Sequence, residues 1–137
     1  MDLINSHKKY KTTPTMVYSC QYHVIFTTKY RRKVLTEPIQ ERAKQLVLEK
    51  QNDYEYELLE MEVMSDHVHL LIDVCPQKGI YKTVGLIKGH LSNILRTEFK
   101  ELKTKLPTLW TRSKFISSVG SVSLETVKKY IEEQKHV

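Results

Sequence analysis

The sequence predicts an α+β fold of the ferredoxin-like kind, in which helices cover one face of an antiparallel sheet. Segments with strand periodicity and segments with helix periodicity alternate in the order β-α-β-β-α-β, and a further helix follows. The two central strands are joined by a short turn at Met64-Ser65-Asp66, which indicates an antiparallel hairpin. With 137 residues and 40% hydrophobic residues, the chain is large enough for one core. We therefore expect a single domain over 1–137, with a polar N-terminal tail over 1–15.

The first half of the chain contains a strand, a helix and a second strand. A strand is expected over about 17–28, because apolar residues alternate there with more polar ones. Thr36 and Pro38 favour a helix start, and the helix should end near Asn52-Asp53. The strand that follows changes phase by one residue near Leu58–Leu59, which indicates a bulge.

The segment from Asp66 to Val74 is expected to be the third strand, and its two faces differ in chemistry. Side chains two residues apart on a strand point to the same side. The side that can enter a core carries four aliphatic residues, Val68, Leu70, Ile72 and Val74. The opposite side carries His67, His69, Leu71 and Asp73. Two imidazoles therefore lie next to each other on the sheet face that helices leave open, with Asp66 and Asp73 nearby.

The second half of the chain contains the clearest helix, which starts near Ile80 and has apolar residues at spacings of three and four. Residues 100–108 are interpreted as a lysine-rich connection, and 109–119 as the last strand. Ser123 can then cap a terminal helix. Tyr130 and Gln134 lie four residues apart on that helix and share one face.

The two histidines, the tyrosine and the glutamine together suggest metal-assisted phosphoryl transfer to a tyrosine. His67 and His69 would bind the metal, and the Gln134 amide oxygen is a hard ligand suited to Mg²⁺ or Mn²⁺. Tyr130 would be the nucleophile. Without further context, the more common interpretation is that the histidines are packed or at the surface, Tyr130 a boundary aromatic and Gln134 a solvated side chain. His23 could reach the same face or pack beside its neighbours.

The charge of the chain suggests a polyanionic partner without proving one. Its formal net charge is +6, and basic residues are clustered in the sequence. A cationic surface binds nucleic acid through counterion release, although a solvated lysine-rich surface fits equally well. The candidate DNA-binding residues are Lys29, Arg31, Arg32, Lys33, Arg112 and Lys114.

Other classes of protein are not indicated by the sequence. There is no apolar run long enough to span a membrane, no signal-peptide core and no Gly-rich nucleotide fingerprint, so we expect a cytoplasmic protein without a nucleotide cofactor. Cys20 and Cys75 lie far apart and are interpreted as free thiols.

Several ordered motifs resemble, nearly end to end, the TnpA-type HUH single-tyrosine transposases of the smallest bacterial and archaeal insertion sequences. The histidine motif is Asp66-His-Val-His-Leu-Leu-Ile72. The other matching segments are Tyr22–Val34, Lys88–Ser92, Leu109–Phe115, Ser118–Gly120 and Val127–Gln134.

The resemblance implies an enzyme that cuts and rejoins single-stranded DNA at insertion-sequence ends through a covalent 5′-phosphotyrosine. It gives His67 and His69 the role of metal ligands, Gln134 that of third ligand and Tyr130 that of nucleophile, with Mg²⁺ or Mn²⁺ as cofactor. It also implies hairpin recognition near the element ends, and a homodimer in which the tyrosine helix of one subunit serves the histidines of the other.

Two alternative functions stay open at this point. One is a domesticated relative that acts on repetitive extragenic palindromes without mobilising an element. The other is a non-catalytic ferredoxin-like module that binds nucleic acid, for which binding would be independent of metal and no strand would be cut.

Overall fold

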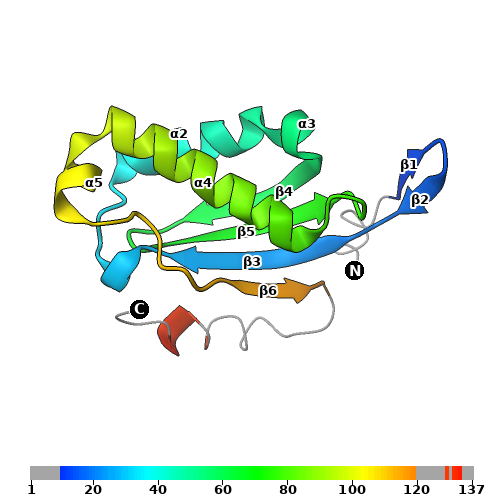
Figure 1. Ribbon diagram of the computed structural model, residues 1–137. Helices are drawn as coiled ribbons and strands as arrows, with labels where there is room; N and C mark the ends of the chain where they lie inside the picture. Colours follow the sequence, from blue (N-terminus) through cyan, green and yellow to red (C-terminus); the bar gives the residue numbers. More distant parts are fainter. Residues whose placement is uncertain (1–9, 120–128, 130, 134–137) are drawn as a thin grey trace.

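The centre of the structure is a four-stranded sheet in which every neighbouring pair of strands is antiparallel (Figure 1). The computed structural model describes residues 10–119, 129 and 131–133. The strand order is β4-β5-β3-β6. The strands are β3 (Gln21–Thr27), β4 (Tyr56–Val63), β5 (His67–Val74) and β6 (Phe115–Ser118).

Two long helices cover one face of this sheet, α2 (Glu37–Glu49) and α4 (Ile80–Glu98). They connect β3 to β4 and β5 to β6, so the element order and strand order are those of the predicted ferredoxin-like fold. Their apolar stripes meet the sheet in one core, where Ile39 and Val84 are fully buried. The predicted inward face of β5 is confirmed, because its four aliphatic residues belong to this core: Val68, Leu70, Ile72 and Val74.

The predicted irregularity in the second strand is also confirmed. The pairing of β4 with β5 shifts between Leu58 and Glu60, as a bulge requires. The helix end predicted at Asn52-Asp53 was wrong by a few residues, because α2 ends at Glu49. Gln51–Tyr54 form a further short helix, α3, which ends where Glu55 adopts a left-handed backbone conformation at φ 61°.

Part of the polar N-terminal tail is docked on the fold. Two short strands, β1 (Lys11–Thr13) and β2 (Met16–Tyr18), form a hairpin beside the main sheet. The strand predicted over 17–28 is divided between β2 and β3. A salt bridge from Lys11 to Glu57 of β4 ties the hairpin to the fold, a distant contact that local periodicity does not reveal.

The region after α4 also differs from the prediction. Lys100–Lys105 form a helix, α5, which buries Leu102 at 0% exposure and so docks despite its lysines. Within the predicted strand 109–119, only β6 pairs continuously with β3. Trp110 makes one isolated bridge with Thr28 and packs edge-on against Phe26, with ring centroids 4.8 Å apart.

The terminal helix is described only in part. Residues 129 and 131–133 are helical, whereas Tyr130 and Gln134 lie outside the described residues. In Figure 1 the turn at 131–133 is drawn on the side of the sheet away from α2 and α4. Among the described residues, no helix is long and apolar enough to cross a membrane. Cys20 and Cys75 are both free thiols, as expected.

Lys88 on α4 gives a testable consequence of this packing. Its ammonium donates to the Thr111 carbonyl oxygen at 2.8 Å, and it lies 5.7 Å from the centre of the Phe26 ring. Burial, with a smaller contribution from the charge of Lys114, lowers the pKa of Lys88 from 10.5 to about 8. Between these two values the unfolded chain holds a proton that the folded chain has lost, so the free energy of unfolding should rise with pH.

Urea denaturation from pH 7.5 to 10.5 should therefore show a rise in stability that is absent in Lys88→Met. The difference between the two profiles should be about 1–2 kcal/mol, after allowance for screening of a partly exposed amine. Parallel profiles for the two proteins would show that Lys88 is well solvated in the folded state.

Candidate functional site

The two predicted histidines both lie on the face of the sheet opposite the helices. His67 and His69 are the first and third residues of β5. This strand pairs with a neighbour on each side, so the backbone at both histidines is fixed. Their side chains are 14% and 17% exposed, which keeps them accessible to a small ligand. The parity argument is therefore confirmed for the position of these rings.

The rest of this face is less open than predicted. Leu71 is 6% exposed and Asp73 is 2% exposed. Asp73 accepts a hydrogen bond from the backbone N–H of Cys20 at 3.0 Å, and the Lys11 ammonium lies 3.9 Å away. Burial raises the pKa of Asp73, which the Cys20 hydrogen bond and the Lys11 charge only partly oppose. Asp73 therefore lies on the same strand as the histidines, but its carboxylate contacts the N-terminal segment.

Asp66, in contrast, contacts the first histidine directly. Its Oδ1 lies 2.8 Å from Nδ1 of His67. A carboxylate on one ring nitrogen fixes the orientation of an imidazole and leaves Nε2 to bind a metal. Burial by itself would raise the pKa of Asp66, but hydrogen bonds from His67 and Arg31 outweigh it, and the pKa is lowered. Asp66 is therefore an anion at neutral pH.

The second histidine has an imidazole as its partner. Nδ1 of His23 lies 3.1 Å from Nε2 of His69, and the two rings stack with centroids 5.3 Å apart. The sequence left the position of His23 open, and the structure shows that it reaches this face. Burial lowers the pKa of both histidines, and the proximity of His23 lowers that of His69 further. Both rings are therefore neutral at pH 7, the state that binds a metal ion.

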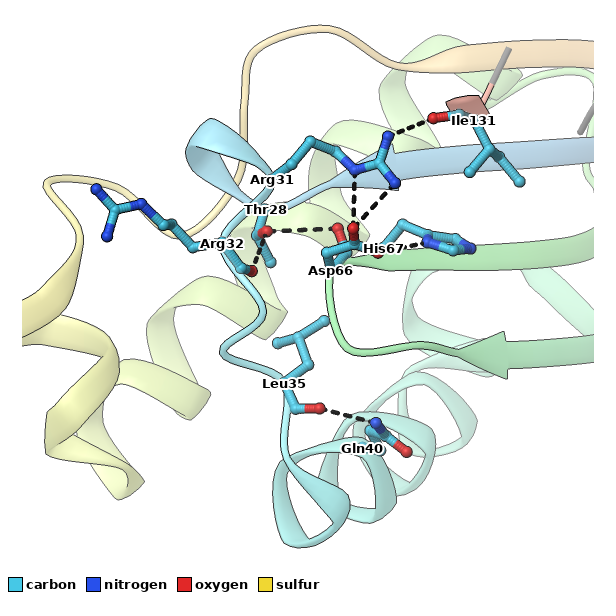
Figure 2. A network of polar contacts seen from close by, with 8 residues as sticks. All are labelled: Thr28, Arg31, Arg32, Leu35, Gln40, Asp66, His67 and Ile131. Atoms are coloured by element: carbon cyan, nitrogen blue, oxygen red, sulfur yellow. Dashed lines mark hydrogen bonds and ion pairs between the residues drawn. The ribbon is translucent and has the colours of Figure 1, made fainter. Parts of the chain in front are cut away.

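Arg31 connects the site to the terminal helix, as Figure 2 shows. Its Nε and Nη2 donate to Oδ2 of Asp66 at 3.0 and 2.9 Å, and its Nη1 donates to the backbone carbonyl of Ile131. Sequence reasoning assigned Arg31 to DNA. In the structure its side chain is 15% exposed, and its guanidinium is engaged within the protein.

The backbone around Arg31 is held in an unusual conformation. Tyr30 and Arg31 have φ values of 59° and 54°, a region that costs non-glycine residues on the order of 1 kcal/mol or more. Neighbouring contacts hold it there. The Thr28 carbonyl accepts a hydrogen bond from the Arg31 N–H at 2.9 Å. The Thr28 hydroxyl donates to the Arg32 carbonyl at 2.7 Å. The Thr28 N–H donates to the Asp66 carbonyl at 3.0 Å, which joins this turn to the start of β5.

The other predicted DNA-binding residues lie in two places on the surface. Arg32, Lys33 and Arg112 are exposed. The Lys29 ammonium lies 5.0 Å from the centre of the Tyr30 ring, and that of Lys114 lies 4.6 Å from the centre of the Tyr81 ring. Cations beside exposed aromatic rings suit a nucleic acid, which offers both phosphates and bases. Their role in binding DNA stays a prediction.

Among the described residues, His67 and His69 would supply two ligands of a divalent metal site. Two imidazoles on one strand face, one of them oriented by a carboxylate, are a common pair of metal ligands. No cluster of three or more His, Cys, Asp or Glu side chains suited to a metal occurs in the part of the chain that the structure describes. The third ligand expected from the sequence, Gln134, belongs to neither that set of residue types nor the described residues.

Comparison with known proteins gives consistent results. The family model described as "Transposase IS200 like" matches residues 16–134. The ISDra2 transposase TnpA of Deinococcus radiodurans is 35% identical over 120 residues, which are 86% of each chain. The transposase for insertion sequence element IS200 of Salmonella typhimurium is 30% identical over 85% of this chain and 78% of its own length.

Solved structures agree in fold. The crystal structure of a candidate transposase from Deinococcus radiodurans R1 has a TM-score of 0.83 at 31% identity, and the match covers 93% of this chain and 99% of that one. A REP-associated tyrosine transposase bound to a REP hairpin has a TM-score of 0.52 at 11% identity, covering 83% of this chain and 62% of that one. At that identity, the second match shows the fold alone.

The pairing of His23 with His69 should make the fold sensitive to acid. Both pKa values are lower in the folded chain than the ordinary 6.5, so the unfolded chain takes up protons first as pH falls below that value. The free energy of unfolding should then fall between pH 6.5 and 5, by no more than about 1 kcal/mol after screening. Chemical denaturation at pH 7 and pH 5 should show a smaller fall for His23→Phe, and equal falls would contradict the pairing.

Proposed function

The chain belongs to the IS200-like transposase family, and from this membership together with the histidine site we propose that it cuts and rejoins single-stranded DNA through a covalent tyrosine intermediate. The observation that carries the proposal is the pair of imidazoles at the start of β5, each held by a neighbouring side chain. His67 and His69 would bind Mg²⁺ or Mn²⁺ together with Gln134. Bound there, the cation would polarise a phosphodiester and stabilise the charge that develops during its attack.

Tyr130 is proposed as the nucleophile. Its phenolic oxygen would attack phosphorus and form a new P–O bond, while the bond from phosphorus to the 3′ oxygen of the preceding nucleotide breaks. The phenol loses its proton, and the departing oxygen takes up a proton to become a free 3′-hydroxyl. The 5′ end stays joined to the tyrosine, and attack by another 3′-hydroxyl reverses the chemistry. No external energy source is required, because each step exchanges one phosphodiester for another.

The substrate is proposed to be single-stranded DNA with hairpins near the element ends. The overall charge of +6 favours a polyanion, and exposed basic residues on the surface would contact its backbone. We propose that the protein acts as a homodimer with active sites shared between subunits, and that residues 1–137 form one domain.

The nucleophile can be tested by trapping the covalent adduct. Single-stranded element ends incubated with the protein and Mn²⁺ or Mg²⁺ should give a protein–DNA band that survives denaturing electrophoresis. Tyr130→Phe should abolish this band, because it removes only the attacking oxygen. An adduct that persists in this variant would overturn the assignment, and cleavage that does not require a divalent metal would overturn the role of the histidines.

A non-catalytic binding module makes the opposite prediction. Such a protein would bind the same DNA equally well with or without metal and would yield no adduct. His67→Ala would then leave its properties nearly unchanged, whereas the proposed enzyme should lose cleavage in this variant while keeping the fold.

Shared active sites can be tested by complementation. His67→Ala and Tyr130→Phe are each expected to be inactive alone. Mixed under conditions in which tagged subunits are seen to exchange, they should recover about a quarter of the wild-type cleavage, since half the dimers are mixed and each has one intact composite site. No recovery despite subunit exchange would show that each subunit uses its own tyrosine.

A further inference from the structure

Arg31 touches two parts of its own chain that carry proposed site residues or lie next to them. On one side its guanidinium binds the Asp66 carboxylate, and on the other it donates to the carbonyl of Ile131 in the terminal helix (Figure 2). Ile131 directly follows the proposed nucleophile in sequence. Arg31 therefore lies between the helical turn at 131–133 and the strand that carries the histidines.

The two oxygens of Asp66 face different partners. Oδ2 accepts from Arg31, and Oδ1 lies 2.8 Å from Nδ1 of His67. The contacts thus form a continuous chain from the Ile131 carbonyl through Arg31 and Asp66 to the His67 ring. A change in the position of Arg31 must change the hydrogen bonding of Asp66, and through it the orientation of the ring.

The chemistry of arginine suits this position. Its planar guanidinium presents several N–H groups in fixed directions, so it can hold a carboxylate and a carbonyl at once, whereas lysine is a mobile point charge. The Arg31 and Asp66 side chains are only 15% and 12% exposed, so solvent cannot easily replace either partner. Loss of one partner would leave a poorly solvated charge.

We infer that Arg31 is a positioning residue that couples docking of the terminal helix to the metal affinity of His67. The metal part of this inference rests on the proposed function, and the helix part does not. Because coupling between two equilibria is reciprocal, a cation bound at His67 should stabilise the docked helix by the same factor by which docking strengthens cation binding. The terminal helix would then dock most firmly on its own chain when the site of that chain is loaded, whichever subunit supplies the tyrosine.

The test compares Arg31→Gln with Arg32→Gln in the full-length protein. Arg32 is a matched control, because it is adjacent, exposed and of the same charge, and it joins the network through its backbone. Two quantities are measured: Mn²⁺ affinity by calorimetry, and hydrogen exchange at the backbone amides of residues 129–133 with and without Mn²⁺.

In the wild type, Mn²⁺ should slow exchange in the terminal helix. Arg31→Gln should weaken Mn²⁺ binding about tenfold or more, the usual effect of losing a group that orients a ligand. It should also speed exchange at residues 129–133 without metal, and Mn²⁺ should no longer slow it. Arg32→Gln should match the wild type in both measurements.

Asp66→Asn is a second variant that distinguishes the contact of Arg31 with the terminal helix from the contact of Asp66 with His67. It also shows whether the effects of Arg31→Gln arise only from a folding defect. It should weaken Mn²⁺ binding and remove the effect of Mn²⁺ on exchange, while leaving the metal-free exchange of the helix closer to that of the wild type. Equal behaviour of Arg31→Gln and Arg32→Gln would overturn the inference. So would a change in only one of the two quantities for Arg31→Gln, because the coupling requires both.

Failure of the proposed function would look different. If the wild type binds no Mn²⁺, the metal-assisted reaction is refuted. Faster metal-free exchange in Arg31→Gln than in Arg32→Gln would still establish that Arg31 holds the helix, and no difference would refute that as well.

Discussion

The structure depends on the alternation of side chains along β5. This strand lies between β3 and β4, so its register is fixed on both sides. Its aliphatic residues fill the core under α2 and α4, and the same geometry turns His67 and His69 to the other face. A slip of one residue would bury the imidazoles and expose the aliphatic side chains. The burial of the aliphatic residues that stabilises the core therefore also fixes the position of His67 and His69.

The parts of the fold that the sequence predicted well are those encoded by local periodicity. The stripe of α4, the alternation of β5 and the bulge near Leu58 each depend on residues close together in the chain. The parts that it missed depend on distant partners. Lys11 forms a salt bridge with Glu57. Trp110 lies outside the continuous strand, where it packs on Phe26 and donates a hydrogen bond to the Lys88 carbonyl. Such contacts leave no periodic signal.

The same distinction applies to the site. The position of His67 and His69 followed from strand parity, but their partners did not. Asp66 adjoins the histidines in sequence, whereas His23 and Arg31 come from elements more than thirty residues away, and strand pairing alone brings His23 beside His69. The contact of Asp73 with Cys20 likewise depends on the pairing of β5 with β3. The motif predicts the ligands, and only the tertiary structure reveals what orients them.

Arg31 also affects the charge that a substrate would meet. A carboxylate beside His67 orients the ring, but an unpaired anion there would repel the phosphodiester that the proposed reaction requires at the same place. The pairing of Asp66 with Arg31 at 2.9 Å cancels that charge locally without removing the hydrogen bond to His67. The rings of His23 and His69 are neutral at pH 7, and the Glu62 carboxylate that lies 4.0 Å from Nδ1 of His69 is largely exposed, so solvent screens it more than Asp66. The ion pair with Arg31 therefore lets the Asp66 carboxylate orient His67 while repelling a phosphodiester less than an unpaired aspartate would.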